Sequence, residues 1–575
     1  MDSSATHEET IQNHHENTKT QQNPSSNNNG GWEAAIFIIF VEMAERFTFN
    51  GLAGNLITFL TKELKQSTPM AAKNVNTWLG ITSFFPFLGA FVADSFLGRF
   101  QTILISSIIY CMGMVLLTVS VSVIPRRYRK SVFFIALYVV SVGEGGHKPC
   151  MTTFAADQFG EETVEEKKKK SSFFNWWYIG LVFGASAATF AVIYVQDNIG
   201  WEAGFGILAG AMGVSMGVFL LGIRRYRKQG HLGSPFTAIA QVFMAAAKNW
   251  NLNENCDDLV IYSGNDHDRD YVLVEAQHTK PRALARTNQF RFLDKAMMID
   301  KRDASNKMRN PWRLCSINQV EEVKLVLRLI PVWMTCIMLQ VVQSLVNTYF
   351  TIQGTTMIRS VGPYFELPPA SLQIFVGLTI ILTLPIYDRI FIPLARKFTG
   401  QPSGITKLQR IGIGLVLSIA TMVVSAPVEA KRLSVAREHI LLDNPEAIIP
   451  MRVWWLLPQY IICGVSDALS LVGLQELFYS EMPDSLRSLG AAAYVSVSGL
   501  ANFVCSAIIS LVQGLSSSHG HNWLDDNLNR AHLDYFYWVI AGLSTLNLCA
   551  YVWIAMRFVY KKVEEVEINE KGLAN

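Results

Sequence analysis

The chain has 575 residues, of which 50% are apolar and only 17% are charged, and its formal net charge is +3 at pH 7. Soluble domains carry about 25% charged residues, so this deficit and the positive mean hydropathy indicate a membrane protein. No basic patch interleaves with aromatic residues, which argues against nucleic-acid binding.

The terminal segments are polar. Residues 1–31 lack the basic start, apolar run and cleavage site of a signal peptide, so we expect a disordered cytosolic tail. Residues 561–575 are predicted to form a second cytosolic tail.

Between the tails, apolar segments long enough to cross about 30 Å of hydrocarbon recur. We place six near residues 34–60, 77–93, 102–124, 132–154, 172–195 and 203–223. Six more follow near residues 323–350, 371–395, 409–427, 453–478, 489–513 and 534–558. We therefore predict an all-α membrane protein with twelve transmembrane helices in two six-helix halves, residues 32–223 and 323–560. A charged cytosolic linker, residues 224–322, joins them, as in the two-halved major facilitator carriers.

The orientation rests on the linker more than on charge. Basic runs at residues 167–170 and 224–228 fit the rule that Lys and Arg concentrate on cytoplasmic loops, whereas those at residues 126–130 and 431–437 fall on the opposite side. We place both termini inside, because an even number of spans puts them together and a long loop is usually cytoplasmic.

The first span contains three charged residues, Glu42, Glu45 and Arg46. A charge at the bilayer centre costs about 2.5–3.5 kcal/mol, so these side chains should face protein or water. A purely structural i,i+4 pair of Glu42 with Arg46 is one interpretation, but it leaves Glu45 without a partner. A second acid beside a bound arginine suits a carrier that takes up and releases protons, and we interpret the three as a proton-coupling group.

The segment GAFVADSFLGRF lies between spans two and three. Asp94 and Arg99 could form a gating latch between neighbouring helices, with Gly89 and Gly98 permitting a tight turn. The alternative is an ordinary turn whose surface ion pair is worth less than about 1 kcal/mol.

Span four ends in GEGGHKPC. Lys148 precedes Pro149, which bends helices and is tolerated in membranes only beside protein or a cavity. Lys148 could therefore reach the acids of span one or an anionic substrate, unless it extends to the membrane interface instead. Glu144 and His147 have i,i+3 spacing, but a carboxylate-bridged metal site needs a second copy of that pair, so we interpret His147 as a packed or interfacial histidine.

Five polar residues in the spans are candidates for binding substrate. An unpaired amide in lipid is costly, so such residues should face a cavity or another helix. Asp467 is a lone acid in span ten, and its alternative role is a helix-packing acid bonded to a hydroxyl. The proposed set is Asn50, Asn175, Tyr178, Gln343 and Asp467.

Several segments together resemble the plant nitrate and peptide transporter family, a branch of the proton-coupled oligopeptide transporters. The resemblance runs from Trp32 to about Tyr560 and rests on ExxER at residues 42–46, GAFVADSFLGR, GGHKPCMTTFAADQF, FFNWWY, NPWRLCSINQVEEVK, FELPPASLQ, PIYDRI, LQRIGIG, LLPQYIICG and LDDNLNRAHLDYFYW. The family implies twelve helices, alternating access and inward proton flow that drives the substrate. It also implies a coupling network of Glu42, Glu45, Arg46 and Lys148.

Departures from the family pattern bear on the substrate. Peptide carriers typically follow the charged motif with two tyrosines, whereas this chain has Phe49 and Asn50, which argues against peptides. The well-known nitrate carrier has a histidine where Gln343 aligns by eye, and an amide cannot become cationic, which argues against high-affinity nitrate binding. Asp467 replaces the usual glutamate and has a shorter reach.

We predict a proton-coupled secondary transporter of a small organic anion, zwitterion or nitrate-like solute, in the plasma or vacuolar membrane. Its expected partners are the small-molecule substrate, protons and membrane lipid, and we expect no nucleic acid, cofactor or metal. The sequence does not determine the oligomeric state. The alternatives are a non-transporting receptor of the same fold and a di- or tripeptide or nitrate transporter. A membrane enzyme would need a nucleophile–base pair or a metal cluster, and the sequence indicates no such cluster. A channel would need a ring of charges lining a pore, and the charges of this sequence are not arranged in that way.

Overall fold

The computed structural model describes residues 30–159, 164–227, 235–250, 287–298, 310–362, 365–400, 405–482, 487–518 and 523–560. The predicted tail at residues 561–575 lies outside this part of the chain, and so does the tail at residues 1–31 apart from its last two residues.

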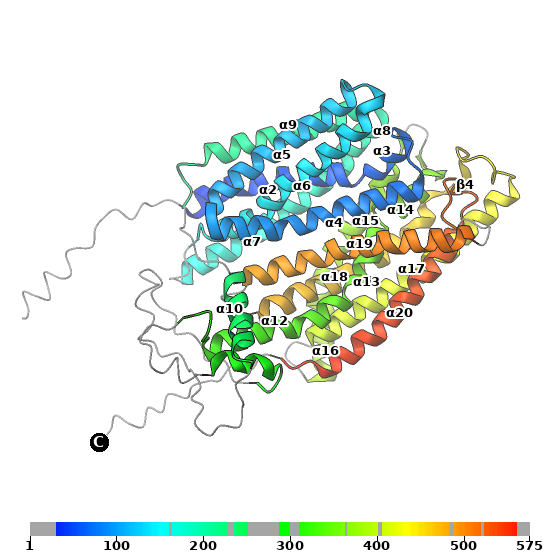
Figure 1. The fold of residues 1–575 in the computed structure, drawn as a ribbon. Coiled ribbons are helices and arrows are strands. Elements are labelled where there is room, and N and C mark those ends of the chain that lie inside the picture. The colour runs from blue at the N-terminus through cyan, green and yellow to red at the C-terminus, as the bar shows by residue number, and fades with distance from the viewer. Residues whose placement is uncertain are drawn as a thin grey trace, which may run out of the picture.

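The described part of the first half is helical (Figure 1). Its elements are α2 (Gly31–Ala53), α3 (Leu56–Lys62), α4 (Thr68–Val92), the π-helix η1 (Ala93–Leu97), α5 (Arg99–Ser122), α6 (Arg126–Ala156), α7 (Val164–Ala187), the π-helix η2 (Ala188–Val192), α8 (Ile193–Asn198) and α9 (Trp201–Leu221). The linker contributes α10 (Pro235–Lys248) and the 3₁₀ helix η4 (Arg291–Met297).

The second half contains α12 (Ile317–Thr335), α13 (Ile337–Ser344), α14 (Tyr349–Thr355), η5 (Pro369–Gln373), α15 (Ile374–Ile386), η6 (Tyr387–Phe391), α16 (Ile392–Thr399), α17 (Lys407–Glu438), η7 (Val453–Leu456), α18 (Leu457–Glu481), α19 (Arg487–Ser518) and α20 (Leu533–Arg557). Four short strands lie in the described parts of its loops. β1 (Met357–Ile358) pairs parallel with β4 (Ile449–Arg452), and β2 (Ser360–Val361) pairs antiparallel with β3 (Phe365–Glu366).

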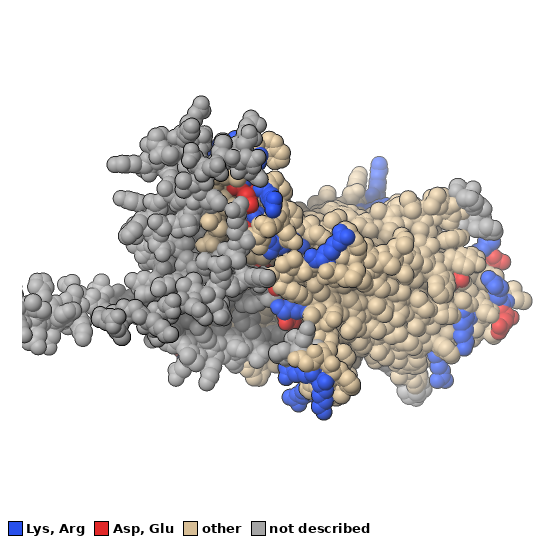
Figure 2. All heavy atoms as spheres, turned by 90° about the horizontal axis from the view of Figure 1, so that it is seen from below, with Lys and Arg blue, Asp and Glu red and all other residues tan. Residues whose placement is uncertain are grey.

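The expected six-plus-six arrangement is confirmed. Nine helices in the described residues are long and apolar enough to cross a membrane, and the bent pair formed by residues 317–335 and 337–355 adds a tenth. The other two spans are α2 and α6, which carry the buried charges discussed below. Figure 2 shows a face on which charged side chains gather toward the two ends and the surface between them is mostly uncharged, as a bilayer requires.

Two predicted local features are wrong. Span seven was expected as one helix from residue 323, but a capping box of Ser316 and Gln319 starts α12 at Ile317, and the span then bends by 41° after Thr335. The expected loop after span two is a single residue, because η1 extends α4 as far as Leu97 and only Gly98 separates it from α5.

The glycines of that segment have different roles. Gly98 has a φ of +78°, a left-handed conformation that suits a sharp turn. Gly89, in contrast, lies within α4, where an added Cβ would stand 2.2 Å from the carbonyl oxygen of Gly145. Its small size therefore permits close packing of α4 on α6, not a turn.

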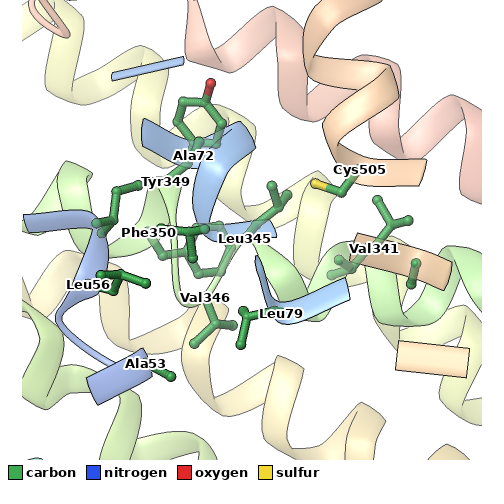
Figure 3. Close-up of a cluster of buried hydrophobic side chains, with 14 of the residues drawn as sticks. Ala53, Leu56, Ala72, Leu79, Val341, Leu345, Val346, Tyr349, Phe350 and Cys505 are labelled. Atoms are coloured by element: carbon green, nitrogen blue, oxygen red, sulfur yellow. The ribbon is translucent and has the colours of Figure 1, made fainter. Parts of the chain in front are cut away.

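The halves meet at the end of the bundle opposite the termini and linker, which we call the sealed end. Apolar residues of the first half, including Leu56 and Leu79, pack there against Leu345, Val346 and Phe350 of the second half (Figure 3). Hydrogen bonds cross the same boundary. The Gln373 amide donates to the Gly54 carbonyl at 3.0 Å, and the Ser371 hydroxyl donates to the Thr189 carbonyl at 3.2 Å.

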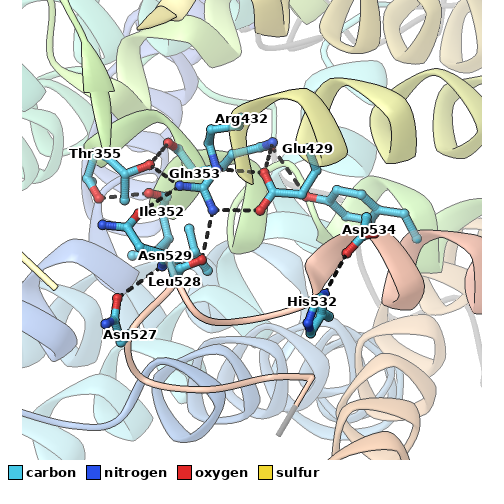
Figure 4. A network of polar contacts seen from close by, with 12 residues as sticks. Ile352, Gln353, Thr355, Glu429, Arg432, Asn527, Leu528, Asn529, His532 and Asp534 are labelled. Atoms are coloured by element: carbon cyan, nitrogen blue, oxygen red, sulfur yellow. Dashed lines mark hydrogen bonds and ion pairs between the residues drawn. The ribbon is translucent and has the colours of Figure 1, made fainter. Parts of the chain in front are cut away.

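A buried ion pair organises the sealed end of the second half (Figure 4). Arg432 and Glu429, both fully buried on α17, form a double hydrogen bond at 2.6 and 2.8 Å. Arg432 also donates to Thr356, Asn529 and the Leu528 carbonyl. Glu429 accepts a 2.6 Å bond from Gln353 of α14. These bonds tie α14, α17 and the loop before α20 together.

A second buried charged cluster holds the linker. Lys324 of α12 contacts Asp294 at 2.5 Å and Glu321 at 2.8 Å, and it donates to the Thr287 carbonyl at 3.1 Å. Val242 and Ala245 of α10 belong to the apolar cluster formed with η4 and α12. The described parts of the linker are therefore packed on the base of span seven.

We expect Arg432→Met to lower the stability of the protein by about 3–5 kcal/mol, because it leaves the Glu429 carboxylate buried without its cation. The neighbouring Lys431→Met is the matched control, since this exposed amine only lies over the Trp455 ring and should change stability by about 1 kcal/mol or less. Thermal unfolding of the purified protein in detergent measures both. Equal, small shifts in the two variants would contradict the structural role.

Candidate substrate and proton site

Helix α2 places the three charges of span one on its buried side. The carboxylates of Glu42 and Glu45 are 3% and 0% exposed. Arg46 Nε lies 2.7 Å from Glu45 Oε2 and 3.6 Å from Glu42 Oε1. One guanidinium therefore faces two carboxylates, so an ion pair of Glu42 with Arg46 does not leave Glu45 without a partner, as the sequence argument against that structural pair had assumed.

Lys148 of α6 pairs within its own helix. Its Nζ lies 3.3 Å from Oε1 of Glu144, which is 1% exposed. No hydrogen bond or ion pair joins Lys148 to Glu42 or Glu45 among the described contacts. The link to α2 is an aromatic ring instead: Arg46 lies 5.9 Å and Lys148 5.6 Å from the centroid of the Phe49 ring.

The sequence reasoning missed two members of this group, Glu144 and Phe49. Glu144 was considered only as a possible metal ligand, although its i,i+4 spacing to Lys148 is that of a helical ion pair. Phe49 was treated only as a missing tyrosine. It stacks on Trp78 with ring centroids 5.8 Å apart, and it holds an apolar surface between the two cations.

Small residues let α6 approach its neighbours. A Cβ at Gly145 would lie 2.4 Å from the Phe85 Cβ of α4, and one at Gly146 would lie 2.0 Å from the Ser106 hydroxyl of α5. His147 is fully buried, and its Nδ1 lies 3.0 Å from the Ser107 hydroxyl, so the packed histidine is confirmed. Close packing fixes the backbone from which Glu144 and Lys148 project.

Of the five predicted substrate residues, the structure describes the side chains of three, Asn50, Gln343 and Asp467. The Asn50 amide donates to the Arg46 carbonyl at 2.8 Å, so its donor is used within α2. Gln343 of α13 donates at 3.4 Å to the carbonyl of Cys463, one turn before Asp467 on α18. Asp467 is buried, and its Oδ1 has no hydrogen-bond partner among the described residues. The side chains of Asn175 and Tyr178 lie outside the described part of the structure.

The predicted gate contains an ion pair that the sequence did not indicate. Arg99, the first residue of α5, pairs with Asp157 just after the end of α6. The side chain of Asp94 is not among those described. Arg99 therefore ties α5 to α6 at the end of the bundle that carries the linker.

The charged group of Glu42, Glu45, Arg46, Glu144 and Lys148 makes fewer hydrogen bonds than its buried polar atoms allow, and in this it differs from the Arg432 network. Among the described residues, both oxygens of Glu45 and one oxygen each of Glu42 and Glu144 lack a hydrogen bond. Buried polar atoms are normally satisfied, so an exception needs an explanation such as an exchangeable proton, water or ligand. Three acids around two cations can change net charge by binding protons and can receive an anion on the cations.

The comparisons with known proteins agree with this chemistry. The family model described as "PTR2: POT family" matches residues 100–524. The chain is 54% identical to the protein NRT1/PTR FAMILY 5.4 of Arabidopsis thaliana over 536 residues, covering 93% of this chain and 96% of that protein. It is 46% identical to NRT1/PTR FAMILY 5.10 of the same plant over 550 residues, covering 93% and 94%.

Solved structures share the fold. The POT family transporter PepTSo matches with a TM-score of 0.68 and 20% identity, covering 91% of this chain and 98% of that one. A POT family transporter in complex with 5-aminolevulinic acid matches with a TM-score of 0.60 and 13% identity, covering 91% and 96%. At these identities the likeness shows the arrangement of helices alone.

The Glu144–Lys148 pair can be tested without a known substrate. Lys148→Gln should lower the melting temperature because it strands a buried carboxylate, and adding Glu144→Gln should restore part of the loss. The control is Lys148→Gln combined with Glu63→Gln, an exposed acid at the end of α3, where the two effects should add. If the Glu144 double variant is also merely additive, Lys148 acts as a side chain reaching the interface.

Proposed function

The chain belongs to the POT family of membrane transporters, and from that premise we propose that it moves a small organic anion or zwitterion together with protons. It is an integral multi-pass membrane protein with the twelve-helix major facilitator fold. The observation that carries the proposal is the buried group of Glu42, Glu45, Arg46, Glu144 and Lys148. Its ion pairs lie beside the Phe49 ring, and several of their carboxylate oxygens lack a hydrogen bond among the described residues.

Proton coupling follows from competition for Arg46. With Glu45 ionised, its carboxylate holds the guanidinium at 2.7 Å. A proton on Glu45 removes that attraction, so Arg46 becomes available to a carboxylate or another anion of the substrate. Return of the proton to solvent restores the ion pair and expels the anion. The guanidinium itself stays charged throughout, because arginine is not deprotonated in proteins.

Alternating access is supported by the asymmetry of the bundle. The apolar contacts and hydrogen bonds described above close the sealed end, while the Lys148 side chain is 29% exposed. We infer that this conformation is open toward the linker end, and we place that end in the cytosol. The proposed location is the plasma membrane or the vacuolar membrane.

The side chains of the proposed substrate site indicate the class of substrate. Arg46 and Lys148 provide two cations for an anion, and Phe49 offers an apolar surface where peptide carriers present a phenol. Asp467, in the other half, could hold an amino group when it is ionised. This combination favours an organic anion or zwitterion. One solved POT family transporter is in complex with 5-aminolevulinic acid. This ligand carries an amino and a carboxyl group, so it is an example of a zwitterion bound by this fold.

The first experiment is a screen for uptake or efflux in oocytes across a pH step, with organic anions, zwitterions, nitrate and dipeptides as candidates. We expect pH-dependent, saturable movement of an organic anion or zwitterion. Saturable high-affinity nitrate uptake or efficient dipeptide uptake would assign the alternative substrates. Absence of movement of any solute, with normal surface expression, would favour a receptor.

We expect Glu45→Gln to abolish accumulation driven by the pH gradient while exchange of bound substrate continues, because glutamine keeps the volume but cannot release a proton. Glu202→Gln, at an exposed acid in the first turn of α9, should behave as the unmodified protein. Radiolabelled uptake and counterflow measure the two activities. Wild-type accumulation and pH dependence in Glu45→Gln would show that another acid couples the proton.

Gln343→His should raise nitrate transport if this position faces the substrate, because a histidine can become cationic whereas an amide cannot. The gain should be largest at acidic pH. Gln343→Asn is the control, since it keeps an uncharged amide. An equal nitrate activity in both variants would place Gln343 outside the pocket, as a residue that only binds the Cys463 carbonyl.

A further inference from the structure

A cavity lies in the second half of the chain, away from the central charged group. Its volume is about 320 Å³, which is within the range of small-ligand sites. Its walls come from η6, α16, the start of α17 and the end of α18, and Tyr560 closes one side. Because Tyr560 follows α20 and precedes the C-terminal tail, the cavity belongs to the linker end of the bundle.

Arg410 is the principal polar group of this cavity. Its side chain is 9% exposed, and its guanidinium Cζ lies 4.3 Å from the centroid of the Tyr387 ring. It donates to Glu476 and to the Ala468 carbonyl, each at 3.4 Å, which is long for a charged hydrogen bond. Its Nε is buried and has no hydrogen-bond partner among the described residues. This nearly buried arginine therefore retains N–H donors that the described protein groups do not fully use.

The rest of the wall also favours an anion. Lys407 lines the cavity at the first position of α17, where the helix dipole adds positive potential. Burial raises the pKa of Tyr560, so its phenol keeps its proton and can donate a hydrogen bond. Among the described side chains, the single acid of the wall is Glu476, whose side chain is 51% exposed and can turn toward solvent.

The surface beside the cavity has the character of a membrane interface. On α16, Leu394 is 54% and Phe398 84% exposed. Arg396 and Lys397 stand exposed on the same short helix. Apolar side chains next to basic ones suit the boundary between acyl chains and anionic headgroups.

We propose that the cavity between α16, α17 and α18 binds a phosphate group, with Arg410 and Lys407 as its cations and Tyr560 as a neutral donor. The phosphate can belong to an anionic lipid headgroup of the adjacent leaflet or to a soluble phosphorylated compound. The arginine fork suits phosphate oxygens, and Glu476 competes with them for Arg410. This site is separate from the transported substrate, so it does not depend on the proposed function.

The test measures binding to the purified full-length protein in detergent. The probes are short-chain phosphatidic acid, short-chain phosphatidylcholine and inorganic phosphate. Saturable binding of phosphatidic acid but not of the other two supports a lipid source, and comparable binding of inorganic phosphate supports a soluble one. No saturable binding of either phosphatidic acid or phosphate overturns the proposal.

Variants locate the binding. Lys407→Gln should weaken it about threefold or more, and Glu476→Gln should tighten it about threefold by releasing Arg410. Arg410→Lys, which keeps the charge but loses the fork, should also weaken it. The control Lys431→Gln, which removes a cation elsewhere in the second half, should leave binding unchanged. If this control weakens binding as much as Lys407→Gln does, or if Glu476→Gln has no effect, the assigned cavity is wrong.

Discussion

The burial of charge inside an apolar helix is the constraint on which the rest of this structure depends. Carboxylates as buried as Glu42, Glu45 and Glu144 are tolerated in a membrane only where cations and protein surround them. Arg46 and Lys148 provide the cations, and the two helices that carry them, α2 and α6, must face the interior of the bundle. The glycines at 89, 145 and 146 then bring α4 and α5 close enough to α6 to keep lipid out.

Two kinds of buried charge occur in the same molecule, and their hydrogen bonding distinguishes them. Arg432 and Glu429 bind each other twice, and further partners from two other segments, α14 and the loop before α20, surround them. Such a network resists change and suits a scaffold. Around Arg46, in contrast, the oxygens of Glu45 lack hydrogen bonds. A group with unused bonding capacity can exchange a proton or a ligand, which is what a transporter requires of its centre.

Different interactions stabilise the two ends of the bundle, which must open in turn during alternating access. Apolar packing closes the sealed end together with hydrogen bonds between the halves, two of which involve the charged side chains of Lys73 and Asp526. At the other end, the Lys324 cluster fixes the described parts of the linker to span seven. The linker therefore has a firm attachment to the second half, and the charged centre lies between these two regions.

The sequence by itself determined the twelve spans, the division into halves and the members of the charged motif, because hydropathy and the cost of intramembrane charge are local properties. The family resemblance gave the transport class. Only the tertiary structure decided the partners: Glu144 for Lys148, Asp157 for Arg99, and a ring contact at Phe49 in place of a direct bond between Lys148 and α2. The role of Gly89 was also invisible, because close helix packing and ion pairing depend on residues that are distant in the chain and adjacent only after folding.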